Sequence, residues 1–181
     1  MLIHLNGWPG SGKLTVGRCL AGLLGARLLD NHTILNVGYA VTERGSAAFY
    51  ETVRAVRAVA FARILELPPE VPVVLTNVVT RGGGSSFPEE TWRAVIDLAA
   101  LRGCALFSAT LTCSPEARAR RLGTAGRVAA DKMHDPAALA AAMATRVLFD
   151  DGATDRRWFD NTDLAPERCA AAIAAWVGHH G

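Results

Sequence analysis

Hydrophobic residues follow two alternating patterns along the chain. Short apolar runs, several of them rich in β-branched residues, predict buried strands, and longer segments with apolar residues at helical spacing predict helices. The predicted strands cover residues 2–6, 26–30, 71–79, 104–112 and 156–160, and the predicted helices cover residues 13–25, 46–67, 88–103, 114–122, 135–149 and 166–178. This alternation predicts an α/β fold of three α/β/α layers, with a mostly parallel five-stranded sheet between two layers of helices.

The predicted elements continue through the chain without an internal repeat or a low-complexity linker. The chain has 181 residues, and half of them are hydrophobic. A chain of this length usually forms one domain, and this composition can supply a sizeable core. We therefore expect a single domain over residues 1–181.

A glycine-rich stretch, "NGWPGSGKLT", joins the first predicted strand to the first predicted helix. Gly7, Gly12 and Lys13 fit the phosphate-loop pattern G-x-x-x-x-G-K-[ST], but Leu14 replaces the hydroxyl residue and Thr15 supplies it one place later. Glycines allow successive N–H groups to point into one concavity, and the following helix adds the positive end of its dipole. The stretch predicts a phosphate-binding loop, with a plain glycine turn as the alternative.

Polar and glycine-rich segments follow the predicted strands. In an open parallel sheet, ligands bind beyond the carboxyl ends of the strands, so these segments predict where the site lies. The segments are residues 6–15, 30–32, 76–84, 112–114 and 160–163.

Charge and cysteine content narrow the classes of partner. The net charge is +2, which gives no reason to expect nucleic acid or a membrane surface as partner. We expect no signal peptide, and the sequence has no apolar run of membrane-spanning length. The four cysteines form no C-x-x-C pair, so we expect free thiols in a cytoplasmic protein. The sequence does not predict the oligomeric state.

The late position of the hydroxyl residue, Thr15, is also found in a known family of phosphate loops. Adenylate kinases have a loop of the form G-x-P-G-S-G-K-x-T, and "GWPGSGKLT" matches it at every fixed position. The chain resembles the P-loop nucleoside, nucleotide and small-molecule kinases, which include shikimate and gluconate kinases. The resemblance implies ATP and Mg²⁺ as cofactors. It also implies that the nucleotide is held by Gly7, Pro9, Gly10, Ser11, Gly12, Lys13, Leu14 and Thr15.

A basic segment, "RARRLGTAGRVAADKM", resembles the arginine-bearing lid of these kinases. The resemblance implies a small lid at about residues 121–135. Arg121 and Arg127 would close on the transferring phosphoryl group, and Arg121 would also bind the nucleotide. Arg146 resembles an arginine that contacts phosphate on the helix after the lid, and we include it with the substrate-binding residues. The alternative is a solvated basic surface.

A metal site needs a carboxylate near the phosphate loop. The third predicted strand ends in Thr76 and Asn77, where many P-loop proteins have an acid. Asp30, at the end of the second predicted strand, is the best remaining candidate. With Thr15, Asp30 is expected to serve Mg²⁺, to act as base for the acceptor hydroxyl, or to do both. A turn or helix-capping acid is the alternative.

The acceptor motifs depart from those of shikimate kinases. Those enzymes have D-x-D after the second strand and G-E-x-x-F-R at the next helix, whereas this chain has "DNH" and "GSAAFY". Tyr50 stands in place of the arginine that binds a carboxylate, and the triple glycine, residues 82–84, comes later than expected. This pattern argues against shikimate as acceptor. We expect a pocket for hydroxyl groups or an aromatic ring, although plain packing would explain each residue equally. Its candidate residues are His32, Tyr50, Arg54 and Asn77.

Together these features predict an ATP-dependent kinase that phosphorylates a hydroxyl group of a small molecule other than shikimate. A nucleoside or nucleotide kinase and a drug-phosphorylating resistance kinase are alternatives within the same class. A nucleotide-binding regulatory protein without transfer activity is the alternative from another class.

Overall fold

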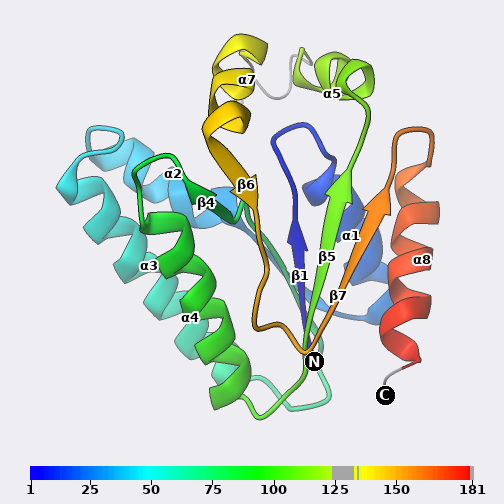
Figure 1. Ribbon diagram of the computed structural model, residues 1–181. Coiled ribbons are helices and arrows are strands. Elements are labelled where there is room, and N and C mark those ends of the chain that lie inside the picture. The colour runs from blue at the N-terminus through cyan, green and yellow to red at the C-terminus, as the bar shows by residue number, and fades with distance from the viewer. Residues whose placement is uncertain (124–132, 134, 180–181) are drawn as a thin grey trace.

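The computed structural model describes residues 1–123, 133 and 135–179. A parallel five-stranded sheet forms the centre of the molecule, with strand order β2-β3-β1-β5-β7 (Figure 1). Its strands are β1 (Leu2–Asn6), β2 (Arg27–Asp30), β3 (Val73–Thr76), β5 (Leu106–Thr112) and β7 (Asp155–Asp160). All five predicted strands are therefore confirmed, and their carboxyl ends lie at one edge of the sheet.

Helices cover both faces of this sheet (Figure 1). They are α1 (Lys13–Leu24), α2 (Asn31–Val41), α3 (Ala47–Leu65), α4 (Phe87–Leu101), α5 (Pro115–Leu122), α7 (Pro136–Thr145) and α8 (Pro166–Gly178). Successive side chains of a strand point to opposite faces. Ile3 accordingly packs with α1 and α8, whereas Leu2 packs with α3 and α4. Because both faces are covered, the central strands are hydrophobic at nearly every position.

The connections between the strands of the main sheet differ from the prediction in two places. Residues 31–41 form helix α2, which the sequence analysis did not assign. The predicted helix over residues 135–149 ends at Thr145, because Arg146 adopts an extended conformation and residues 146–148 form strand β6. This strand pairs antiparallel with β4 (Thr80–Gly82) in a small second sheet.

Side chains cap the starts of three of the seven described helices. Ser46, Ser114 and Asp135 each accept a hydrogen bond from a backbone N–H in the first turn of α3, α5 and α7 respectively. Helix α1 differs, because it begins after Gly12 without a side-chain cap. None of the helices in the described part of the chain combines the length and apolar character needed to cross a membrane.

Candidate functional site

The loop between β1 and α1 has a backbone that glycine alone adopts readily. Gly7, Gly10 and Gly12 have φ values of 140°, 85° and 88°. A Cβ atom at Gly7 would lie 2.5 Å from the carbonyl oxygen of Leu111, and one at Gly10 would lie 2.9 Å from Cγ of Arg118. The glycines are thus required both by backbone conformation and by close packing against β5 and α5.

The N-terminus of α1 has the features of an anion site. Its cap residue, Gly12, has no side chain, so no side-chain oxygen satisfies the N–H groups of the first turn. Lys13 lies at the first position of the helix, and its Nζ donates to the carbonyl oxygens of Gly7 at 2.5 Å and Trp8 at 3.2 Å. The ammonium group is therefore held over the loop, beside the positive end of the helix dipole.

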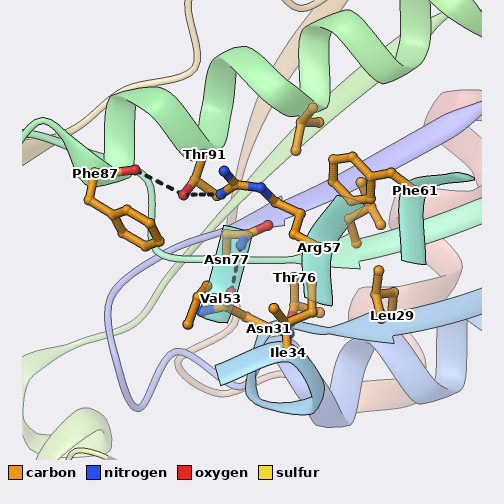
Figure 2. Close-up of a pocket in the computed structure, with 12 residues that line it drawn as sticks. Leu29, Asn31, Ile34, Val53, Arg57, Phe61, Thr76, Asn77, Phe87 and Thr91 are labelled. Atoms are coloured by element: carbon orange, nitrogen blue, oxygen red, sulfur yellow. Dashed lines mark hydrogen bonds between the residues drawn. The ribbon is translucent and has the colours of Figure 1, made fainter. Parts of the chain in front are cut away.

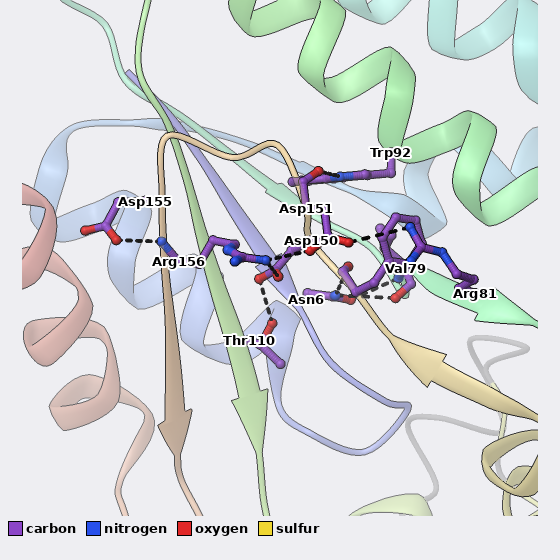
Figure 3. A network of polar contacts seen from close by, with 10 residues as sticks. Asn6, Val79, Arg81, Trp92, Thr110, Asp150, Asp151, Asp155 and Arg156 are labelled. Carbon is purple, nitrogen blue, oxygen red and sulfur yellow. Dashed lines mark hydrogen bonds and ion pairs between the residues drawn. The ribbon is translucent and has the colours of Figure 1, made fainter.

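Asn6 fixes the start of this loop, and the sequence analysis assigned no role to its side chain. Its Oδ1 accepts from the N–H groups of Gly7 at 2.8 Å and Val79 at 2.9 Å. Its Nδ2 donates to the carbonyl oxygens of Val79 and Phe149 (Figure 3). Asn6 is fully buried and joins the loop to the segments that lead into β4 and out of β6. The small second sheet is thereby held against the phosphate loop.

Beside Asn6, Asp150 is buried at the end of the β6 segment. Its carboxylate accepts a hydrogen bond from Thr110 on β5 and pairs with Arg156 on β7 (Figure 3). Asp151 binds the same guanidinium at 2.7 Å. These groups tie the β6 segment to the main sheet and are satisfied within the fold, so we assign them a structural role.

A cavity of about 350 Å³ lies on the β5 and β7 side of the loop. Its wall includes Arg121, whose guanidinium donates to Oδ1 of Asn161 at 2.9 Å and to the Asn161 carbonyl oxygen at 2.8 Å. Asn161 in turn donates to the carbonyl oxygen of Ser11 at 2.7 Å. The remaining lining residues are Gly10, Gly12, Thr15, Val16, Leu164 and Pro166. The structure thus joins the predicted loop residues to Arg121 through Asn161, which the sequence analysis had placed only within a loop.

A carboxylate lies on the opposite side of the loop, at the end of β2. Oδ1 of Asp30 accepts from the hydroxyl of Thr76 at 2.6 Å, and that hydroxyl accepts from the N–H of Asn31 at 3.2 Å. Asp30 occupies the cap position of α2, but its side chain makes no capping hydrogen bond. The capping alternative is therefore not what holds this carboxylate in place.

A second cavity adjoins this carboxylate, at the ends of β2 and β3 (Figure 2). It measures about 20 Å³, which is room for about one water molecule. Asn31, Thr76 and Asn77 line it at the sheet edge. The other lining residues come mainly from α3 and α4 and are mostly apolar: Leu29, Ile34, Val53, Arg57, Phe61, Leu75, Phe87, Thr91 and Val95.

A fully buried histidine stands behind this second cavity. Nε2 of His4 lies 3.2 Å from Oδ1 of Asn77, and Nδ2 of Asn77 donates to Oδ1 of Asn31 at 2.9 Å. Burial lowers the pKa of His4 to about 3, so the imidazole is neutral and donates one proton. An Nε2–H donor to Asn77 leaves only the acceptor Nδ1 of His4 without a partner, which is less costly than an orphaned N–H.

Helix α3 places Arg57, rather than the predicted residues, in the cavity wall. Tyr50 and Arg54 are not among the lining residues, because Tyr50 packs on Phe49 and Phe87 and Arg54 binds Glu90 at the surface. Arg57 lies seven residues after Tyr50, which is about two helical turns and returns to nearly the same helix face. That spacing alone does not identify Arg57 as a lining residue, because its position depends on Glu90 and Thr91 of helix α4.

The other predicted residues fall in three places. His32 lies in the first turn of α2, next to Asn31, but does not line either cavity. Arg146 lies on β6 rather than on a helix, and its side chain packs so closely on Gly83 that there is no room for a Cβ atom at that glycine. Arg127 lies outside the described residues, as does most of the predicted lid.

Outside the loop and the two cavities, the described residues contain neither a group of metal ligands nor a disulfide. Among the described residues, no three histidine, cysteine, aspartate or glutamate side chains are grouped as metal ligands. All four cysteines are free thiols. The two candidate oxygen ligands, Thr15 and Asp30, lie on the first turn of α1 and at the end of β2.

Sequence comparison links part of the chain to a shikimate kinase. No model of a protein family matches the sequence. A stretch of 98 residues is 37% identical to a curated shikimate kinase of Salinispora tropica and makes up 51% of this chain and 52% of that protein. The match spans about half the length of the curated relative.

Structural comparison covers nearly the whole chain. A kinase candidate of Chloroflexus aurantiacus has a TM-score of 0.69 at 16% identity, covering 99% of this chain and 94% of that one. A sugar kinase of Janibacter sp. HTCC2649 has a TM-score of 0.60 at 16% identity, with coverages of 98% and 94%. The APS kinase CysC of Mycobacterium tuberculosis, solved with AMPPNP and APS, has a TM-score of 0.60 at 16% identity, with coverages of 98% and 96%.

Shikimate kinases and a gluconokinase are among the other structural neighbours. The predicted relationship is confirmed at the level of the fold: the chain has the P-loop kinase fold, with a parallel five-stranded α/β sheet. At identities of 16–18%, a likeness in fold does not identify the molecule on which this protein acts.

Proposed function

We propose that this protein is an ATP-dependent phosphotransferase that phosphorylates a hydroxyl group of a small molecule. One observation carries the proposal: the phosphate loop, with its open helix N-terminus, lies between two cavities. Strand β1 precedes the loop and is flanked by β5 on one side and β3 on the other. The larger cavity lies on the β5 side, and the smaller lies at the ends of β2 and β3. A transfer reaction needs a donor and an acceptor site on either side of the transferring group.

The larger cavity suits the donor nucleotide. Its floor is formed by loop glycines and Val16, and its wall includes the fixed guanidinium of Arg121 beside Pro166. A planar guanidinium can stack on an aromatic base, and loop N–H groups with Lys13 suit the phosphates. Arg127 is proposed to neutralise charge on the transferring group.

The carboxylate of Asp30 suits a metal ion and the acceptor hydroxyl. The hydroxyl of Thr76 donates to Oδ1 of Asp30, so the carboxylate is held in a fixed position as a hydrogen-bond acceptor at the end of β2. Mg²⁺ prefers oxygen ligands, keeps several waters and needs only one or two protein groups, so Asp30 and Thr15 fit it directly or through water. The ion would neutralise negative charge on the phosphates. Asp30 itself would orient the acceptor hydroxyl and receive its proton.

The smaller cavity suits the acceptor, since it adjoins Asp30 at the edge of the sheet. Asn77, predicted from the sequence, and Asn31 supply hydrogen-bonding groups there. Shikimate is not the proposed acceptor, because Tyr50 lacks the paired donors that an arginine offers a carboxylate. His32, Tyr50, Arg54 and Arg146 remain proposed contacts for a larger acceptor that extends beyond the small cavity.

The proposal is tested by ADP release that depends on an added acceptor. A panel of sugars, polyols, nucleosides, aminoglycosides and phenolic compounds would be screened with ATP and Mg²⁺. Asp30→Asn should lower the acceptor-dependent rate by about 10²-fold or more, since it removes a general base. Asp97→Asn, an exposed change on α4, is the matched control and should leave the rate unchanged.

Binding measurements distinguish the remaining outcomes. Nucleotide binding without transfer to any acceptor would favour the regulatory protein. Absence of nucleotide binding by calorimetry would refute the proposal as a whole.

A further inference from the structure

We infer that the acceptor is an uncharged molecule with an apolar body, and that Glu90 is the residue that sets this preference; the inference rests on the proposed function. Of the described residues that line the smaller cavity, only Arg57 carries a charge at neutral pH. Glu90, which lies just outside the lining, already neutralises that charge. Arg57 could otherwise have bound a carboxylate of the acceptor, but the carboxylate of Glu90 already occupies that role.

Arg57 is held firmly at the cavity wall. Its side chain is only 9% exposed. One terminal nitrogen donates to the hydroxyl of Thr91 at 2.8 Å (Figure 2). The other donates to Oε1 of Glu90 at 2.7 Å. Thr91 uses its own proton to donate to the carbonyl oxygen of Phe87 at 2.9 Å, so its oxygen is oriented to accept. Arg57 therefore has a defined position and a defined counter-charge.

Glu90 is itself locked in the ionised state. Arg54 donates to both of its oxygens, at distances of 2.8–3.0 Å, while Arg57 binds Oε1. Hydrogen bonds from Arg54, and then from Arg57, lower the pKa of the Glu90 carboxyl. The Arg54 side chain is 47% exposed and that of Glu90 is 38% exposed, so solvent weakens the effect of both charges at the cavity. The charge of Arg57, the one charged side chain among the described lining residues, is therefore already paired within the fold before any acceptor binds.

The charge balance selects against ions of either sign. An anionic acceptor would bring a second carboxylate beside Glu90, and a cationic one would meet the guanidinium of Arg57, in surroundings with little water to screen either. Apolar side chains such as Ile34, Val53 and Phe61 form the rest of the wall and favour an apolar ring or chain.

Two amides supply the polar recognition. Because His4 donates to Oδ1 of Asn77 and Asn77 donates to Oδ1 of Asn31, the Nδ2 group of Asn31 is the donor left to offer a ligand. A hydroxyl or carbonyl oxygen of a neutral acceptor would accept from it. The groups that line the cavity therefore suit a hydroxylated, uncharged ring compound, most of which would lie outside this small cavity, better than a hydroxy acid.

The test compares matched compounds that differ by one carboxylate. The pairs are shikimate and methyl shikimate, D-gluconate and D-glucitol, and 4-(hydroxymethyl)benzoate and its methyl ester. Dissociation constants would be measured by calorimetry, without nucleotide, for the wild type, Glu90→Gln and Glu89→Gln. Glu89 is the matched control, because it is the neighbouring acid on α4 and lies 3.8 Å from Arg81 rather than near Arg57.

We expect the wild type and Glu89→Gln to bind neutral members more tightly than carboxylates. Glu90→Gln should gain about tenfold or more in carboxylate affinity, because Arg57 then lacks its counter-charge. A wild type that prefers carboxylates, or a Glu90→Gln variant that gains nothing, would overturn the inference. If Glu90→Gln proves unfolded by circular dichroism, the wild-type comparison decides alone. If the wild type binds no nucleotide, the proposed function is refuted. The affinities for the compound pairs can still be compared, because they are measured without nucleotide.

Discussion

Lys13 is the residue on which nucleotide binding is expected to depend most. Its ammonium group lies over the loop carbonyls of Gly7 and Trp8, so it can turn to phosphate without disturbing the core. We expect Lys13→Ala to weaken ATP binding at least about tenfold, since a hydrogen bond to a charged group contributes about 1.5–3 kcal/mol. Titration calorimetry measures this, and Arg18→Ala, an exposed change on the same helix, is the control.

The same substitution separates a binding role from a structural one. Thermal unfolding of Lys13→Ala should match that of the wild type, because the side chain faces the loop rather than the core. A variant that binds and turns over ATP like the wild type would show that the loop does not hold phosphate.

His4 should make the protein sensitive to mild acid. Its pKa is about 3 in the folded state and 6.5 in the unfolded chain. Between these values the unfolded state binds one more proton, so the free energy of unfolding falls as pH falls, by about 1.4 kcal/mol per pH unit. The contribution is fully present above pH 6.5 and is lost progressively below it.

Urea unfolding at several pH values between 5 and 8 tests this. His4→Gln keeps an amide N–H that can donate to Asn77 but cannot titrate in this range. Its free energy of unfolding should therefore fall less steeply below about pH 6 than that of the wild type. Equal slopes in the two proteins would mean that His4 is not the group that titrates.

Among the elements, the loop and helix α1 respond to the same substitution in opposite ways. Gly7 has a φ of 140° and no room for a Cβ atom, which would lie 2.5 Å from a backbone oxygen. Gly22 is an exposed residue inside α1 with no atom within 4 Å of the position of a Cβ. Gly7→Ala should therefore destabilise the fold by more than about 1 kcal/mol, from backbone strain and the clash.

Gly22→Ala serves as the matched control. It should stabilise the protein by about 0.5–1 kcal/mol, because alanine is the better helix former. Thermal and urea unfolding of both variants measure the difference. Equal effects would contradict the loop conformation.

At the scale of the whole molecule, the proposed transfer is expected to use the basic segment after α5, acting on a group bound between the two cavities. Arg127 lies in that segment, outside the described residues. If its contacts form mainly in the transition state, Arg127→Ala should lower kcat by about 10²-fold or more with only a few-fold change in nucleotide affinity. Lysine should not restore the rate fully, since it lacks the planar pair of donors.

Arg120→Ala, an exposed change on α5, is the control for that experiment. Turnover with an identified acceptor and calorimetric nucleotide affinity are measured together. If kcat is unchanged, Arg127 belongs to a solvated basic surface and has no part in transfer. If nucleotide affinity is lost while kcat is intact, Arg127 contacts phosphate in the ground state.

The sequence by itself determined the sheet and the phosphate loop. The central strands β1, β3 and β5 carry nearly continuous apolar runs because both of their faces are covered, and this signal is local. The loop is equally local, since positive φ values at Gly7, Gly10 and Gly12 and the following lysine are encoded within a few residues. Asp30 and Asn77 could be placed at the site because parallel strands end at a common edge.

Only the tertiary structure decided which side chains line the second cavity. Arg57 enters it because α3 packs against α4, where Glu90 and Thr91 hold the guanidinium. The sequence separations are 33 and 34 residues, so no local pattern encodes these contacts. The same reason explains why residues 146–148 form a strand: their partner is β4, some 66 residues earlier in the chain. Pairing between distant segments overrides the helical propensity that an alanine-rich sequence suggests.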